Sequence, residues 1–208
     1  MCKAERHLLP NGTEITYYDE THTYMINGKE VPSITTLIRD HYGDKYEGVD
    51  PEVLKKASEY GTKVHAELQQ AIDLRNEDPV APFFCETPEA NNYFNQVEKI
   101  YKINPKFTEK VVALYDPNNN IVACGRLDLI CDVAGDLTIA DFKTTYSVNR
   151  QYVSAQLNLY ATAARQSGYI NNEEYNKLKL GVIHLHGSVA KYVPVVKFAE
   201  DFYLQFII

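Results

Sequence analysis

The sequence lacks tryptophan, has only 2 methionines and contains no long apolar run. No stretch approaches the roughly 18 consecutive apolar residues that a membrane-spanning helix needs. The first residues, MCKAERHLLPNGTEITYYDE, lack the apolar centre of a signal peptide and the acid-poor composition of a transit peptide. We therefore expect a cytoplasmic protein that has no membrane partner.

Other missing patterns exclude further classes of protein. The 4 cysteines include no CxxC pair, which argues against a zinc knuckle. Cys124 and Cys131 are an odd number of residues apart on one expected strand, so they should face opposite sides of it. No GxxxxGKS or GxxxxGKT loop is present, so we expect no helicase motor in this chain. A hydrophobic content of 45%, with 10 glycines and 9 prolines in 208 residues, excludes disorder and low complexity.

The formal charge of −7 argues, taken alone, against a nucleic-acid partner, because a polyanion is normally bound by lysine and arginine. Net charge sets only the long-range attraction, however. Carboxylates that hold a divalent cation can attract phosphate locally. Whether the protein can bind nucleic acid therefore depends on where its acidic residues lie.

Hydrophobic periodicity and turn residues predict a single α/β domain over residues 1–208, because no repeat or linker divides the chain. Asn27-Gly28 predicts an N-terminal hairpin over about 15–31. Ser33 should cap the short helix that follows it. Gly61 lies inside a long helix, where a close approach by another segment would explain it. The further predicted elements are helices over 51–75, 87–101 and 149–167, a meander of strands over 107–115, 121–133 and 137–143, a short helix, strands near 179–186 and 190–197, and a terminal helix from about 198.

Two aspartates of the meander can meet across a hairpin. A two-residue turn at Ala134 and Gly135 places Asp128 opposite Asp141. A turn centred on Gly135 and Asp136 instead places Lys143 opposite Asp128, and Lys143 shares a strand face with Asp141. Either register gathers the two acids and the lysine on one face.

This grouping favours metal-dependent phosphate chemistry. Paired carboxylates repel each other unless a cation lies between them, and hard oxygen ligands suit Mg²⁺ or Mn²⁺. The Lys143 ammonium could orient an attacking water or stabilise charge that develops on the phosphate. The alternative is a solvated strand face on which Lys143 pairs with one aspartate.

Four motifs resemble, in order and spacing, those of the PD-(D/E)XK nuclease superfamily, and in particular its RecB-like branch of phage and CRISPR-associated exonucleases. The segments His22-Thr-Tyr24, Gly28 and Val31–Thr36 are similar to the opening segment of small phage members. The resemblance covers roughly residues 20–196. It implies a restriction-endonuclease-like core, in which a central mixed sheet with an antiparallel meander is flanked by helices. The four motifs are Gly61-Thr-Lys-Val-His65, Gly125-Arg-Leu-Asp128, Asp141-Phe-Lys143 and Gln156-Leu-Asn-Leu-Tyr160.

The resemblance also implies roles for individual residues. His65, Asp128, Asp141 and the backbone carbonyl of Phe142 would face the metal, and Lys143 would be the catalytic lysine. Glu109 resembles an acid that some members use near a second metal. Gln156 and Tyr160 lie one helical turn apart and would help to position DNA.

The sequence differs from the pattern of many family members in two respects. The second acid is aspartate where many relatives have glutamate, which shortens that ligand by one methylene. Members with an iron-sulfur cluster carry three cysteines after the Gln-Tyr helix, whereas no cysteine follows Cys131, so we expect no cluster. Arg150 and Lys63 are further candidates for contacts with the DNA backbone.

These features together predict a metal-dependent DNA exonuclease that acts on single strands or duplex ends in phage or bacterial recombination, replication or repair. One or two Mg²⁺ or Mn²⁺ ions would be its cofactor, and a recombination or replication protein could be a partner. It would act in the cytoplasm of a bacterial or phage-infected cell. A catalytically silent DNA- or protein-binding module is one alternative. A zinc hydrolase built on His184 and His186, which have zinc-like spacing, is another.

Overall fold

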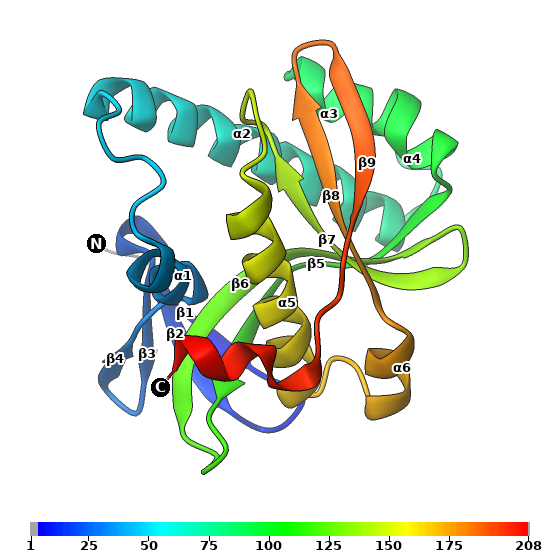
Figure 1. The fold of residues 1–208 in the computed structure, drawn as a ribbon. Helices are drawn as coiled ribbons and strands as arrows, with labels where there is room; N and C mark the ends of the chain where they lie inside the picture. Colours follow the sequence, from blue (N-terminus) through cyan, green and yellow to red (C-terminus); the bar gives the residue numbers. More distant parts are fainter. Residues whose placement is uncertain (1–3, 208) are drawn as a thin grey trace.

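Two β-sheets lie beside a long helix in the computed structural model, which describes residues 4–207 (Figure 1). Within these residues, a four-stranded antiparallel sheet has the order β1-β2-β3-β4, and a five-stranded sheet has the order β5-β6-β7-β8-β9. The chain builds the smaller sheet first and then the larger one, in sequence order.

The N-terminal sheet is larger than the hairpin predicted over 15–31. Asn27 and Gly28, with φ of 49° and 77°, do form the predicted tight turn. Two more strands pair with it, and the exposure of their side chains alternates along each strand. The strands are β1 (Ala4–Leu8), β2 (Glu14–Tyr18), β3 (Thr23–Ile26) and β4 (Lys29–Val31).

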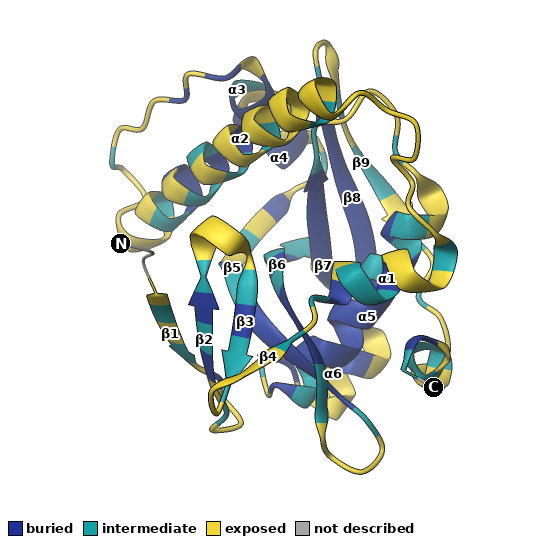
Figure 2. Cartoon of the chain, turned by 90° about the vertical axis from the view of Figure 1, so that its left-hand side faces the viewer, coloured by how far each residue is buried: buried dark blue, intermediate teal, exposed yellow. Residues whose placement is uncertain are grey.

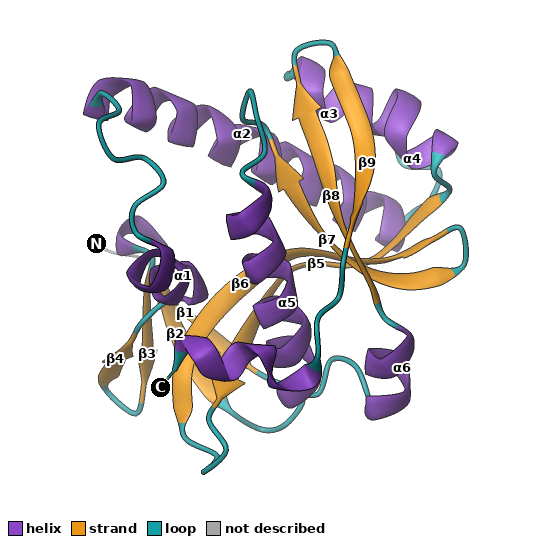
Figure 3. Ribbon diagram, in the orientation of Figure 1, coloured by secondary structure: helices purple, strands orange, loops and turns teal. Residues whose placement is uncertain are grey.

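The larger sheet contains the predicted meander and is mixed. Strands β5 to β7 pair antiparallel in succession, β8 pairs parallel with β7 after a helical crossover, and β9 returns antiparallel (Figure 3). This α/β architecture, a mixed sheet with an antiparallel meander and flanking helices, confirms the predicted fold class. The strands are β5 (Ile103–Tyr115), β6 (Ile121–Val133), β7 (Asp136–Lys143), β8 (Lys179–His186) and β9 (Val189–Val195).

Helices cover the larger sheet, and the first of them begins at its predicted cap. The Ser33 hydroxyl accepts the Thr36 N–H at 3.0 Å and begins α1 (Ile34–Tyr42). The predicted helix over 87–101 is interrupted by a π-helical turn at Tyr93–Val97. No helix in residues 4–207 is long and apolar enough to cross a membrane. The remaining helices are α2 (Pro51–Glu77), α3 (Pro88–Asn92), α4 (Glu98–Ile100), α5 (Arg150–Gln166), α6 (Asn172–Lys177) and a 3-10 helix at Glu200–Phe206.

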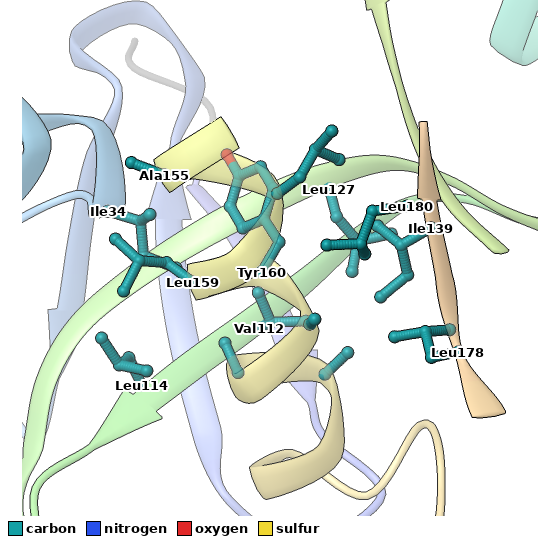
Figure 4. Packing of buried hydrophobic residues seen from close by; sticks show 14 of the residues in the cluster. Ile34, Val112, Leu114, Leu127, Ile139, Ala155, Leu159, Tyr160, Leu178 and Leu180 are labelled. Atoms are coloured by element: carbon teal, nitrogen blue, oxygen red, sulfur yellow. The ribbon is translucent and has the colours of Figure 1, made fainter. Parts of the chain in front are cut away.

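Buried side chains form three clusters, which fix the helices and the N-terminal sheet to the larger sheet. Figure 2 shows long buried stretches in β7, β8 and α5. The first cluster packs α5 and α1 against the sheet, and Leu127 and Tyr160 belong to it (Figure 4). The second packs α2 and the 88–100 helical segment, and the third packs β2 and β3 against β5 and β6. The Cys124 N–H also donates to the Pro32 carbonyl at 3.0 Å, which joins the two sheets.

The alternation of side chains along β6 is interrupted at Asp128. Leu127 packs in the α5 cluster, whereas Leu129, two residues later, packs in the α2 cluster. Cys124 and Cys131 consequently both pack away from α5, in clusters that contain no α5 residue. The expectation that they face opposite sides is therefore wrong, because a regular period of two does not hold across this position.

Candidate functional site

A cavity of about 740 Å³ lies between the N-terminal sheet, α2 and the larger sheet. The N-terminal sheet, α1, α2, α5 and β5 to β7 all contribute residues to its walls. Polar and charged side chains gather in it from sequence positions that are far apart. Among them are His22, His65, Glu109, Arg126, Asp128 and Lys143.

Three carboxylates face one another across the strands that line this cavity. The β6–β7 turn has φ of 52° at Ala134 and 97° at Gly135, and Leu129 pairs with Ala140. This register is the first of the two alternatives, in which Asp128 lies opposite Asp141. On the other side of β6, Thr108 pairs with Leu129 and Lys110 pairs with Leu127, which puts Glu109 opposite Asp128. The acids Glu109, Asp128 and Asp141 thus form a row across β5, β6 and β7.

His65 brings α2 to the centre of this row. Its Nδ1 lies 3.6 Å from Asp128 Oδ1, and one ligand atom each from His65, Glu109 and Asp128 lie within 4.8 Å of one another. Burial alone would lower the pKa of His65, but the Asp128 carboxylate outweighs it and raises that pKa to about 9.

Asp128 is the central acid of the row and is held in its ionised form. Burial would raise its pKa, but the facing His65 imidazole and a backbone hydrogen bond lower that pKa below its usual value. The hydrogen bond comes from the Phe142 N–H, which donates to Asp128 Oδ2 at 2.7 Å. In Glu109 the effects that raise the pKa outweigh those that lower it. Burial and then repulsion from Asp128 raise the pKa of Glu109 to about 7, although Arg126 Nε lies 2.7 Å from its Oε2.

Lys143, which is partly exposed, and the buried Asp141 form an ion pair at one end of the row. Lys143 Nζ lies 2.6 Å from Asp141 Oδ2, and the side chain of Asp141 is 2% exposed. Burial raises the pKa of Asp141, and repulsion from Asp128 acts in the same direction. The Lys143 ammonium also donates to Gln156 Oε1 at 3.2 Å, so α5 fixes the lysine from the other side.

The donor set fits a hard divalent cation. An imidazole nitrogen and carboxylate oxygens converge from α2, β5 and β6, and Asp141 follows on β7. A cation at this point would relieve the repulsion that raises the pKa of Glu109. The structure thus brings ligand atoms of His65, Glu109 and Asp128 together, whereas the Asp141 carboxylate pairs with Lys143 beside them, so Asp141 and the Phe142 carbonyl stay predicted ligands.

Tyr160 lines the cavity from α5, and Gln156, one helical turn before it, contacts Lys143 at the cavity wall. Tyr160 lines the cavity, and Gly125 on β6 leaves room for its ring, because a Cβ at Gly125 would lie 2.5 Å from Tyr160 Cε1. Burial raises the pKa of Tyr160 well above its usual value, so its hydroxyl remains a donor.

Two predicted DNA contacts lie outside the cavity walls. Lys63 on α2 makes an ion pair with Glu86 at 2.6 Å, and it is not among the residues that line the cavity. Arg150 is exposed at the start of α5 and does not line the cavity either. The structure therefore does not bring these two residues to the acids, and their contact with DNA stays a prediction.

The zinc alternative has no support in the described part of the chain. The His184 Nε2–H donates to the Thr145 carbonyl at 2.7 Å, and the His186 Nδ1–H donates to the Thr144 carbonyl at 2.8 Å. The group of converging ligand atoms found among residues 4–207 contains neither histidine. Both imidazoles instead hold the loop that follows Lys143.

Sequence reasoning missed several charged or polar residues of the cavity, among them Arg126 and Tyr46. Arg126 pairs with Glu109 and lies over the Tyr17 ring, 5.0 Å from its centroid. Its position two residues before Asp128 on one strand was a usable signal. Tyr46 reaches the cavity from the loop between α1 and α2, and no sequence pattern indicated it.

The chain was compared with known families, sequences and structures. The sequence profile of the PD-(D/E)XK nuclease superfamily matches residues 39–201. A solved structure described as the crystal structure of SSO0001 is similar at a TM-score of 0.49 and 12% identity, over 88% of this chain and 75% of that chain. No curated protein sequence matches this one.

Proposed function

Because the chain belongs to the PD-(D/E)XK nuclease superfamily, we propose that it is a metal-dependent exonuclease that hydrolyses DNA. The substrate would be single-stranded DNA or the ends of duplexes. The observation that supports the proposal most directly is the row of three acids across β5, β6 and β7, of which Glu109 and Asp128 line one cavity together with Lys143 and His65. Those residue types are the ones that phosphodiester hydrolysis needs.

The ligands of the proposed ion are His65, Asp128, Asp141, Glu109 and the Phe142 carbonyl. One or two Mg²⁺ or Mn²⁺ ions bound there would polarise the phosphate and make water a stronger nucleophile. The protein's own groups orient the reactants. Lys143 Nζ, held by Asp141 and Gln156, can fix the attacking water or stabilise charge that develops on the phosphate oxygens.

We further propose that this nuclease is of the RecB-like type. The Gln156 and Tyr160 pair on α5 supports this proposal, because Gln156 contacts Lys143 and Tyr160 lines the cavity. Gln156, Tyr160, Arg150 and Lys63 would contact DNA. The protein would act in phage or bacterial recombination, replication or repair in the cytoplasm, with a recombination or replication protein as a possible partner.

End-labelled single-stranded and duplex DNA, incubated with the protein with and without Mn²⁺, tests the activity. We expect Mn²⁺-dependent loss of nucleotides from the ends. The Lys143→Ala variant should cleave at least about a hundredfold more slowly, because the proton-transfer and electrostatic role of the lysine is lost. Its Mn²⁺ affinity, measured by calorimetry, should remain close to that of the wild type, because the carboxylates remain.

The matched control is Lys177→Ala, which removes an exposed lysine paired with Glu173 on α6. Its cleavage rate should equal that of the wild type. Retained turnover in Lys143→Ala would exclude the proposed role of the lysine. A wild-type protein that binds DNA and leaves it intact would instead support the silent binding module.

A further inference from the structure

Two histidines on β8 fix the loop that follows Lys143. His184 and His186 on β8 donate their ring N–H groups to the carbonyls of Thr145 and Thr144, at 2.7 and 2.8 Å. The Thr145 hydroxyl donates to the Ser147 carbonyl at 2.9 Å. The loop backbone is thus tied to the sheet and to itself directly after the proposed catalytic lysine.

This fixed loop presents one aromatic side chain to solvent. Tyr146 is 85% exposed, and the edge of the His186 ring meets it at a centroid distance of 5.7 Å and an interplanar angle of 87°. Tyrosine rings are usually buried to a much greater extent. The neighbouring Thr145, Ser147 and Asn149 are exposed and polar, so the ring is not part of an apolar patch of the kind that docks another protein.

The loop also forms part of the cavity that contains the acids. Thr144 and Thr145 both line that cavity. Thr144 Oγ1 would lie 3.2 Å from a Cβ at Gly61, so the loop packs closely against α2 at a residue without a side chain. Tyr146 therefore follows directly after two residues of the cavity wall.

A chain with a formal charge of −7 has little general attraction for a polyanion. Stacking on an aromatic ring supplies affinity that does not depend on net charge, and it needs a base that is free of its partner strand. A ring held in place by an anchored loop loses little freedom when a base stacks on it.

We propose that Tyr146 is a stacking platform for an unpaired nucleobase, and that His184 and His186 hold it there. The inference rests on the proposed function and narrows its substrate to a DNA strand that is single-stranded where it leaves the cavity. It also gives the two histidines a role other than zinc binding.

The test compares oligonucleotides of about 12 nucleotides, a length typical of single-strand sites. One carries its bases, one has the same phosphates but abasic sugars, and one is a blunt duplex. Binding is measured by fluorescence anisotropy with Mg²⁺ in a Lys143→Ala background, in which the strand survives. We expect Tyr146→Ala to weaken binding of the base-carrying strand about tenfold and to leave the abasic strand unchanged. Tyr146→Phe should bind like the parent, because the ring remains.

Two further variants sharpen the test. Phe84→Ala removes another ring that is 86% exposed, in the segment 78–87, which contributes no residue to the cavity wall, and its binding should equal that of the parent. His186→Ala should weaken binding of the same strand, and the double variant with Tyr146→Ala should be no weaker than Tyr146→Ala alone.

Equal affinity of Tyr146→Ala and its parent for the base-carrying strand would overturn the inference. Equal losses on the abasic strand would overturn it as well, because they would show a contact with phosphate. If the wild-type protein cleaves DNA in either case, the proposed function survives. A wild-type protein that neither binds nor cleaves any of these DNAs would overturn the proposed function and the inference together.

Discussion

Glu109 combines two unfavourable features at one residue. Its φ is +48°, a conformation that non-glycine residues rarely adopt, and its carboxylate is buried opposite Asp128. Strained backbone persists where the surrounding structure imposes it, and such residues concentrate at functional sites. Here the β5–β6 backbone pairs at Thr108 and Lys110, on both sides of Glu109, fix the strand, and Arg126 forms an ion pair with the Glu109 carboxylate.

The pKa of about 7 at Glu109 predicts how pH affects the stability of the metal-free protein. Between its ordinary pKa of 4.5 and about 7, folded Glu109 keeps a proton that the unfolded chain has lost, so the free energy of unfolding falls as pH rises. Glu109→Gln cannot ionise. In EDTA, its Tm relative to the wild type should therefore increase from pH 5 to pH 8, as measured by circular dichroism.

The control for this experiment is Glu14→Gln on β2, an exposed position. Its Tm relative to the wild type should stay constant over the same pH range. A Glu109→Gln variant that is less stable than the wild type at pH 8 would mean that the pair with Arg126 outweighs burial and repulsion.

At the residue scale, contacts could be predicted from the sequence where they follow from the number of residues between two paired strand positions. Asp128, Asp141 and Lys143 lie on paired strands joined by a short turn, so their meeting could be predicted from spacing. The approach of His65 could be inferred only from a resemblance, because it depends on how α2 crosses the sheet. Arg126 was missed because its partner Glu109 lies on a different strand, in a backbone conformation that no local pattern indicated.

At the element scale, the fit of α5 against β6 depends on Gly125. A methyl group there would lie 2.5 Å from Tyr160 Cε1, and the buried ring has little room to move. Overpacking of this kind costs about 1–3 kcal/mol. Gly125→Ala should therefore lower the Tm, and it should also reduce cleavage per folded molecule, measured well below the Tm, because Tyr160 and its helix shift at the cavity.

Gly181→Ala provides the matched control. Its Cβ would lie 2.1 Å from Tyr192 Cε2, at a pair of residues that do not line the cavity. This variant should also lose Tm but should keep the cleavage rate of the folded wild type. Equal activity losses in the two variants would show that Gly125 acts through general stability.

Elements with long periodic patterns and clear caps were predictable. The helix that begins at Pro51 and the three strands of the meander lie close to their predicted bounds, since apolar spacing and turn residues agree there. The four-stranded N-terminal sheet was not predicted in full, because its strands are short and its pairing partners are set by tertiary packing. The π-helical turn at Tyr93–Val97 also had no sequence signal.

At the scale of the whole molecule, the row of acids should couple metal binding to global stability. A ligand that binds only the folded state stabilises it by about 2.7 kcal/mol at a concentration of 100 times its Kd. For a chain of this size that corresponds to a Tm increase of roughly 5–10 °C. We expect Mg²⁺ or Mn²⁺ to raise the Tm of the wild type by an amount of this order in differential scanning calorimetry.

The Asp128→Asn variant tests the location of that effect. Asp128 is the central acid of the row, so its neutralisation should remove most of the metal-dependent increase in Tm. An equal increase in the variant would put the bound ion elsewhere on the protein. The net charge of −7 makes this control necessary, since exposed acids also attract divalent cations weakly.

The bridge between Ser33 and Cys124 and the packing of the N-terminal strands on β5 and β6 join the first part of the chain to strands that are synthesised much later. Tyr17 and Tyr24 find their packing partners on β5 and β6, roughly 90 residues downstream. At about 5–20 residues per second, a ribosome needs roughly 5 to 20 seconds to make that stretch. The apolar side chains of the nascent N-terminal strands stay uncovered for this time, which makes them a target for chaperones that bind emerging polypeptides.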